Sequence, residues 1–229
     1  MNISLKNKYA LVCGGSKGIG LASAIELSKL GCNVTLLARN PDSLGEAIKQ
    51  LDKSQGQIHR FISVDQSNPT EVSKRLSTIG QGFHILVLNS GGPKGGRMID
   101  ASLEDLQIGF DSLLLSNQVI VKHSFEYMKK ADFGRIINII SIGLKEPIVG
   151  LGVSNTIRGA VGNWSKSLAY ELGPHGITVN NILPGYTMTD RLSKLMDSRA
   201  QDRNMDVDAL IETYVEQIPA KRLATPDEI

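Results

Sequence analysis

The residues of this sequence best suited to chemistry are the glycines of a turn near its N-terminus, CGGSKGIG at 13–20. Glycine lets the backbone turn tightly and approach a ligand closely, and a helix that starts in such a turn offers free N–H groups and a positive dipole. An apolar run precedes this turn and an amphipathic stretch follows it, which is the context that makes a glycine turn informative. We therefore expect a dinucleotide pyrophosphate to bind at Gly14, Ser16, Lys17, Gly18, Ile19 and Gly20.

The end of the second apolar run indicates which dinucleotide binds. An acid there would hydrogen-bond the adenosine ribose of NAD, whereas a cation would pair with the additional phosphate of NADP. The sequence has Ala38-Arg39-Asn40 and no acid, and Lys17 adds a second cation in the glycine turn. These residues favour NADP(H) over NAD(H), although both cations are also explained as solvated surface charges.

Alternating short apolar runs and longer amphipathic stretches must position this site. Such alternation is typical of βαβ units, and runs this continuous predict strands covered on both faces. We expect one α/β domain over 1–229, a Rossmann-type doubly wound parallel sheet whose ligand crevice lies at the carboxyl ends of the strands. The expected strands are 8–13, 33–39, 58–64, 83–89, 134–140 and 177–183, and the expected helices 18–30, 42–51, 68–79, 102–130 (in one or two pieces) and 154–172.

The segment 187–217 interrupts this alternation, because it has a helical pattern but follows the sixth strand. A long connection above a ligand crevice is often a lid, and the alternative is a peripheral helical pair without a gating role. Thr225-Pro226 followed by two acids has the pattern of a helix start. The sequence thus predicts a lid and a chain that is incomplete at its C-terminus.

Composition excludes several classes of protein. A net charge of +2 without a basic stripe argues against nucleic-acid binding. The two cysteines, Cys13 and Cys32, lie in apolar surroundings and match no zinc spacing, so we expect buried free thiols and no metal. The N-terminus lacks a signal-peptide pattern, and no apolar run reaches membrane-spanning length. We expect a soluble, cytoplasmic protein without membrane contact.

From residue 5 to 229 the chain resembles the short-chain dehydrogenase/reductases, in particular 3-oxoacyl-acyl-carrier-protein reductases. The resemblance rests on the glycine turn, on Val64-Asp65, on LNSGG at 88–92, on Leu183-Pro184-Gly185 and on the spacing of the elements. It implies that Asp65 and Gln66 face the adenine, and that Asn89 and Gly91 flank its ribose. It also places Pro184, Gly185, Thr187 and Thr189 beside the nicotinamide.

The same resemblance reveals an unusual catalytic centre. The family uses Asn, Ser, Tyr and Lys, and only the Ser is present, as Ser141; the Tyr position holds Ser154, the Lys position Arg158 and the Asn position Leu113. Asn117, one helical turn later, is a weak substitute for the Asn. Arg158 can hold ribose hydroxyls and stabilise a developing alkoxide, but a guanidinium does not give up its proton.

A serine is a much weaker acid than a phenol, so another group has to supply the proton. Tyr186 is the first candidate, with an apolar wall as the alternative reading, and Lys145 and Glu146 lie in a loop over the same pocket. The resemblance implies hydride transfer between NADP(H) and a carbonyl or alcohol. The alternatives are a dinucleotide-binding or regulatory protein without catalysis and a structural subunit of a hetero-oligomer.

The sequence indicates the substrate and the oligomeric state less specifically than the fold and the cofactor. An apolar small-molecule substrate suits the pocket candidates Ile142, Leu144, Val149, Leu151, Tyr186, Met188, Leu192 and Met196. By resemblance, the chain is expected to form a homodimer or homotetramer through 114–130 and 154–172. The residues expected on that face include Leu114, Gln118, Val121, Ala160 and Trp164.

Overall fold

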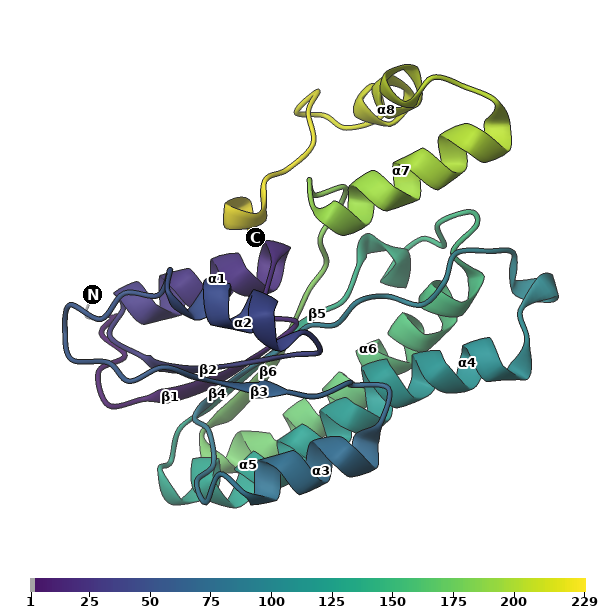
Figure 1. The fold of residues 1–229 in the computed structure, drawn as a ribbon. Coiled ribbons are helices and arrows are strands. Elements are labelled where there is room, and N and C mark those ends of the chain that lie inside the picture. Colours follow the sequence, from purple (N-terminus) through teal and green to yellow (C-terminus); the bar gives the residue numbers. More distant parts are fainter. Residues whose placement is uncertain (1–2) are drawn as a thin grey trace.

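The computed structural model describes residues 3–229 and contains a six-stranded, entirely parallel sheet in the order β3-β2-β1-β4-β5-β6 (Figure 1). This order confirms the doubly wound Rossmann-type sheet. The direction of strand addition reverses between β1 and β4, so the ligand crevice of such a sheet lies at the carboxyl ends of these two strands. The strands are β1 (Tyr9–Cys13), β2 (Asn33–Ala38), β3 (Arg60–Ser63), β4 (Ile85–Leu88), β5 (Gly134–Ile139) and β6 (Ile177–Ile182).

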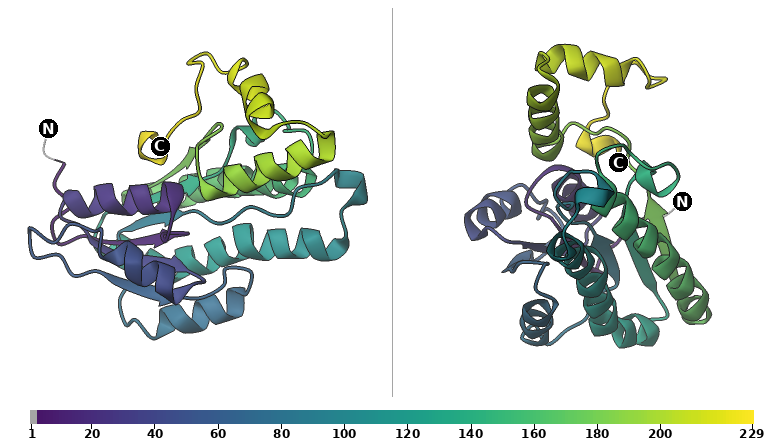
Figure 2. Two further views of the ribbon diagram at one scale, coloured as in Figure 1. Left: turned by 45° about the horizontal axis from the view of Figure 1, so that its top comes forward. Right: turned by 90° about the vertical axis from the view of Figure 1, so that its right-hand side faces the viewer.

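Helices cover the two faces of the sheet in separate layers (Figure 2). The helices α1 and α2 lie over one face, and α3, α5 and α6 lie over the other. Asn40 and Asn68 start α2 and α3 by accepting hydrogen bonds from backbone N–H groups, and a proline follows each of them. The α-helices of these layers are α1 (Gly18–Lys29), α2 (Pro41–Ile48), α3 (Pro69–Ser77), α5 (Ser116–Lys130) and α6 (Gly152–Leu172).

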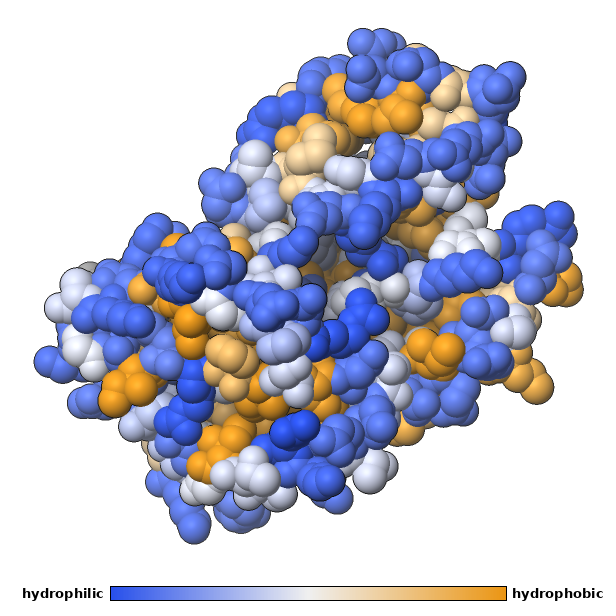
Figure 3. Space-filling view, viewed as in Figure 1, coloured by the Kyte–Doolittle hydropathy of each residue, from blue (hydrophilic) through white to orange (hydrophobic). Residues whose placement is uncertain are grey.

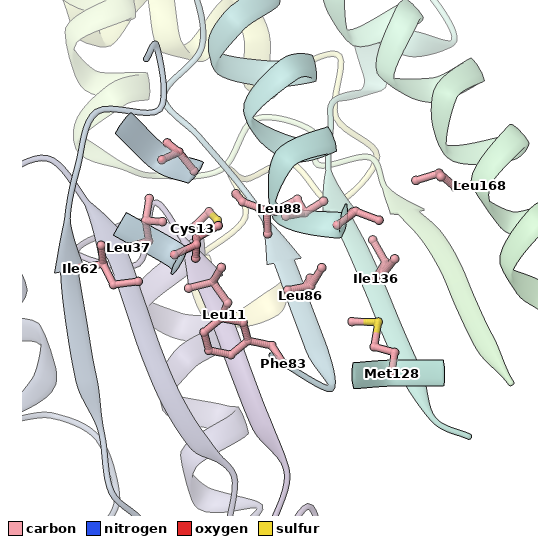
Figure 4. Packing of buried hydrophobic residues seen from close by; sticks show 14 of the residues in the cluster. Leu11, Cys13, Leu37, Ile62, Phe83, Leu86, Leu88, Met128, Ile136 and Leu168 are labelled. Atoms are coloured by element: carbon pink, nitrogen blue, oxygen red, sulfur yellow. The ribbon is translucent and has the colours of Figure 1, made fainter. Parts of the chain in front are cut away.

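Each helical layer encloses its own hydrophobic core. The core beneath α3, α5 and α6 contains Leu11, Phe83 and Leu86, all of which are fully buried (Figure 4). Cys13 and Cys32 belong to the two cores and are free thiols, as the sequence predicts. Burial raises the pKa of both thiols to about 12, so both are protonated and unreactive at neutral pH.

The prediction that all strands are covered on both faces is wrong for the two edge strands. In β3, Arg60 and Phe61 are exposed, and in β6 exposure alternates, with Thr178 and Asn180 facing outward. The four inner strands have neighbours on both sides, whereas an edge strand can leave one face in solvent. A short apolar run does not distinguish these two situations.

The expected helical stretch 102–130 consists of α4 (Leu103–Phe110), a π-helical turn (Asp111–Leu115) and α5 in direct succession. The π turn inserts an additional residue into the helical repeat and therefore rotates the residues that follow it. Two residues expected on the oligomer face have other roles. Val121 of α5 is buried in the core between the sheet and the helices α3, α5 and α6, and Gln118 accepts a hydrogen bond from Trp164 Nε1 at 2.7 Å within the chain.

The segment 187–217 forms two further helices, α7 (Asp190–Arg203) and α8 (Val207–Val215), with a small apolar cluster of their own. This pair, which we call the lid after the role that stays a prediction from the sequence, stands beyond the end of the sheet (Figures 1 and 2). The space-filling view is hollowed between the lid and the rest of the molecule (Figure 3). Thr187 pairs with Ala224 in a parallel bridge, and a short 3-10 helix begins at Pro226.

Within residues 3–229, none of the helices is both long and apolar enough to span a membrane.

Candidate active site

The glycine turn is built to receive an anion. Gly14 and Gly18 adopt positive φ angles of 58° and 52°, which side chains rarely tolerate, and a Cβ on Gly20 would collide with the Gly14 carbonyl. Helix α1 follows directly, and its N-cap residue, Lys17, makes no side-chain capping bond. The first N–H groups of α1 therefore lack a side-chain acceptor, as do those of α6, whereas α2, α3, α4, α7 and α8 all have one. This arrangement fits a phosphate at the start of α1.

Asn89, at the end of β4, supports this turn. Its Nδ2 atom lies 2.6 Å from where a Cβ on Gly14 would be, and 3.0 Å from the same point on Gly20. Gly91 has open space around its Cβ position, so the backbone beyond β4 is accessible on that side. The residues that the resemblance placed on either side of the crevice are thus brought together between β1 and β4.

Both cations expected at the NADP phosphate lie on the surface and face acids. Lys17 Nζ is 2.9 Å from Asp190 Oδ2, and Arg39 Nη1 is 3.8 Å from Asp65 Oδ2. All four side chains are about half exposed or more, so solvent screens both pairs and they stabilise the fold only weakly. A phosphate dianion can replace the carboxylate in either pair, so the pairs are compatible with NADP. Gln66 is buried beside them, and its Nε2 has no partner among residues 3–229.

The segment after β6 holds the start of the lid against the glycine turn. The carbonyl of Pro184 accepts a hydrogen bond from Ile142 N at 3.2 Å, and Gly185 is exposed. Thr187 is buried, and the Thr189 hydroxyl caps α7 by accepting from Leu192 N at 3.2 Å. Thr189 also lies 3.1 Å from where a Cβ on Gly18 would be. The two threonines therefore flank the crevice, with Thr189 closest to the turn.

Arg158 connects the residues expected to carry out catalysis. Its Nε donates to Ser154 Oγ at 3.1 Å, and its Nη1 donates to the carbonyls of Ile139 (3.2 Å) and Ile140. Ile139 is the last residue of β5 and Ile140 follows it; the next residue is Ser141, whose Oγ accepts from Gly143 N at 3.0 Å. Burial, with a smaller contribution from the charge of Arg191, lowers the pKa of Arg158 to about 10, so the guanidinium is charged at neutral pH.

A small cavity of about 10 Å³ lies behind Arg158. Leu113 and Asn117 both line it, as does Asn138, whose buried Oδ1 has no partner among residues 3–229. The cavity is near the lower limit for one water molecule. Asn117, which the sequence offered only as a weak substitute for the missing Asn, therefore lies beside Arg158, one helical turn after Leu113.

Tyr186, the candidate substitute acid, packs into the apolar cluster of the lid. Its ring centroid is 4.9 Å from that of Tyr214, and Arg199 donates to the Tyr214 hydroxyl at 2.9 Å. Burial raises the pKa of Tyr186, with Tyr214 adding to the effect. Leu192 and Met196, expected to line the substrate pocket, are buried in the same cluster. This packing favours the reading of Tyr186 as an apolar wall, while Lys145 and Glu146 are exposed.

Sequence reasoning missed Arg191, in the first turn of α7. Its Nη1 donates to the Gly92 carbonyl at 2.8 Å and its Nη2 to the Pro93 carbonyl at 3.3 Å. These carbonyls belong to the loop after β4, ninety-eight or more positions earlier in the chain. The only sequence signal for a functional role of Arg191 is its position directly after Thr189-Asp190, next to the expected nicotinamide site.

Known proteins are similar to this chain in sequence and in fold. Residues 8–200 match the family model for short chain dehydrogenases. A 3-oxoacyl-acyl-carrier-protein reductase of Rickettsia bellii is 31% identical over 233 residues, covering 99% of this chain and 88% of the relative. An NADPH-dependent reductase of Bacillus subtilis, BacG, is 25% identical over 228 residues, covering 98% and 88%. The crystal structure of L-sorbose reductase from Gluconobacter frateurii, complexed with NADPH and L-sorbose, superposes with a TM-score of 0.91 at 28% identity, covering 100% of this chain and 88% of that one.

Proposed function

The chain belongs to the short-chain dehydrogenase family, and from this premise we propose that it is an NADP(H)-dependent oxidoreductase that reduces a carbonyl or oxidises an alcohol. The observation that carries the proposal is the placement of Arg158. This one cation joins Ser154 to the end of β5, directly before Ser141, at the edge of the sheet where the glycine turn lies. Two hydroxyls and a permanent positive charge there can receive an oxygen that becomes negative during the reaction.

The protein supplies the binding groups for the dinucleotide. The uncapped start of α1 would hold the pyrophosphate, and Gly91 leaves room for the ribose. Arg39 would pair with the additional phosphate of NADP, because no acid stands at the end of β2 to favour NAD. The relatives and the superposed structure that are named for NADPH support this choice. When bound, the nicotinamide supplies or accepts the hydride.

The two serines would hold the substrate oxygen, and Arg158 would stabilise the charge on it. Ser154 accepts a hydrogen bond from a cation, so its own hydroxyl proton is free to point toward the substrate. The guanidinium strengthens that donation without losing a proton itself. The proton that completes reduction comes from solvent or from Tyr186, and the packing of Tyr186 in the lid favours solvent.

Turnover with NADPH tests this proposal. We expect the protein to bind NADPH, measured by the fluorescence of the bound cofactor, and to oxidise it in the presence of some members of a panel of apolar ketones. The control is Arg158→Met, which removes the charge and should bind NADPH but turn over at least about 10²-fold more slowly. Tight NADPH binding without turnover on any ketone or alcohol would instead indicate a dinucleotide-binding protein.

The finer predictions on substrate and assembly belong to the same proposal. We expect a small, largely apolar substrate and a homodimer or homotetramer. Support for assembly through 114–130 and 154–172 comes from the aromatic Tyr170 of α6 (88% exposed). The neighbouring α4 also exposes two large apolar side chains, Leu103 (85%) and Ile108 (47%). Light scattering at micromolar concentration measures this directly, and a monomeric mass would contradict it. A cytoplasmic location agrees with two free, buried thiols and can be checked by cell fractionation.

A further inference from the structure

Two guanidinium groups converge at the end of β4. A Cβ placed on Gly92 would collide with Arg191 Nη2 and would lie 3.3 Å from Arg158 Nη2. Arg158 comes from the helix after β5 and Arg191 from the lid, so the tertiary fold alone brings them together. Glycine at position 92 is what leaves room for both side chains.

Both guanidiniums lack an acidic partner. Within residues 3–229, every hydrogen bond of Arg158 and Arg191 goes to a neutral oxygen, namely the Ser154 hydroxyl or a backbone carbonyl. The one acid next to them in sequence, Asp190, faces Lys17 instead. Two adjacent cations repel each other, and the charge of Arg191 lowers the pKa of Arg158. An anion bound between the two guanidiniums would offset this electrostatic repulsion.

One guanidinium nitrogen of Arg158 is left for a ligand, next to Ser154. Nε and Nη1 of Arg158 are used inside the protein, so Nη2 is the part of the guanidinium left for a ligand. Because Nε of the same planar group binds Ser154, an anion on Nη2 would lie next to the oxygen that Ser154 holds. The pyrophosphate already has the uncapped start of α1 and its glycine turn. The pair therefore matches an anion of the substrate better than one of the cofactor.

We propose that Arg158 and Arg191 bind a carboxylate of the substrate, so that the enzyme acts on 2-oxo or 3-oxo carboxylic acids and their hydroxy acids. This inference rests on the proposed oxidoreductase function and specifies its substrate class. A carboxylate one or two carbons from the reacting carbonyl can reach the pair while the carbonyl oxygen lies at Ser154. Arg191 closes this site only when the lid lies against Gly92 and Pro93, so the anion also links substrate binding to the lid.

The test measures binding without requiring turnover. Hydroxy acids cannot react with NADPH, so they form inert complexes with the NADPH-loaded protein. Two matched pairs are titrated by calorimetry: 2-hydroxy-4-phenylbutanoate and 3-hydroxy-3-phenylpropanoate, each against its primary amide. We expect at least one acid to bind about 10- to 100-fold more tightly than its amide, the range of one charge-assisted hydrogen-bonded pair. If no acid binds more tightly than its amide, the proposal is overturned.

Variants show which side chain produces the preference for the acid over its amide. Arg191→Gln should abolish the preference for acid over amide while the Kd for NADPH stays within about threefold, and Gly92→Ala should weaken the preference by displacing the guanidinium. Lys194→Gln is the matched control, because it removes one charge from an exposed position in the same helix and should change neither value. A rise in the NADPH Kd of about tenfold or more in Arg191→Gln, with the acid preference intact, would assign Arg191 to the cofactor and overturn the inference. If the acid preference is found but no substrate turns over, the proposed reaction fails while the carboxylate site stands.

Discussion

Replacing Ser154 by alanine tests how this catalytic centre works. Ser154 is 5% exposed, and its Oγ accepts the Nε–H of Arg158 at 3.1 Å. The variant removes the hydroxyl that would donate to the substrate oxygen but keeps the cation behind it. Removing one hydrogen-bond donor to a developing oxyanion typically lowers the rate by about 10²–10³-fold. We expect the low end, about 10²-fold in kcat/KM, because Arg158 still stabilises the developing charge.

The same variant has a cost in stability that can be separated from catalysis. Arg158 loses one of its three hydrogen-bond partners, and a bond to a charged group contributes about 1.5–3 kcal/mol. Ser165→Ala is the matched control, because Ser165 is equally buried in α6 and its Oγ donates to Gly162 and accepts from Asn181. It should lose a similar amount of stability without losing activity.

The assay is NADPH oxidation with a ketone that the parent protein reduces, alongside urea unfolding and the NADPH Kd of each variant. We expect Ser154→Ala to lose activity at unchanged NADPH affinity. If kcat/KM of Ser154→Ala stays within about threefold of the parent, Ser154 does not hold the reacting oxygen, and the role assigned to it here is wrong. If Ser165→Ala loses as much activity as Ser154→Ala, the loss reflects helix packing instead.

Three further predictions concern the cofactor, the lid and pH. Arg39→Ala should weaken NADPH binding by about 10- to 100-fold and leave NADH binding unchanged, since a charge-assisted pair with phosphate is lost; equal losses for both cofactors in a fluorescence titration would refute the assignment. Tyr186→Phe should change the reduction rate by less than about threefold if the ring is a wall packed on Tyr214, whereas a loss of about 10²-fold or more at constant NADPH affinity would identify it as the proton donor. Burial lowers the pKa of His84 from 6.5 to about 4, and its Nδ1 accepts the Tyr9 N–H at 3.0 Å, so the folded state needs the neutral ring. The unfolded chain gains this proton first, so the free energy of unfolding should fall as pH decreases from about 6.5 to about 4, by at most about 3 kcal/mol; urea unfolding curves that do not shift over this range would contradict it.

The sequence alone predicts much of the scaffold, because the signals for it are local. The apolar runs, the glycine turn and the asparagine-proline starts of α2 and α3 depend on neighbouring residues, and each appears in the structure at or near its predicted place. The cofactor preference also follows from one position, Arg39 at the end of β2. The exposure of the edge strands β3 and β6 cannot be predicted from local sequence, because it depends on which strands become neighbours in the sheet.

The details of the candidate site depend on contacts between distant segments. Sequence spacing places Ser154 and Arg158 one helical turn apart, but it does not show that Arg158 also binds the carbonyls at the end of β5. Nor does it show that Tyr186 packs into the lid, or that Arg191 reaches Gly92 ninety-nine residues earlier. Helix and turn signals depend on residues a few positions apart in the sequence. The two cations Arg158 and Arg191, in contrast, become neighbours only after the sheet, the helix α6 and the lid have folded together. Local sequence therefore determined most of the fold and the expected cofactor, and only the tertiary structure decided which side chains come together at the candidate site.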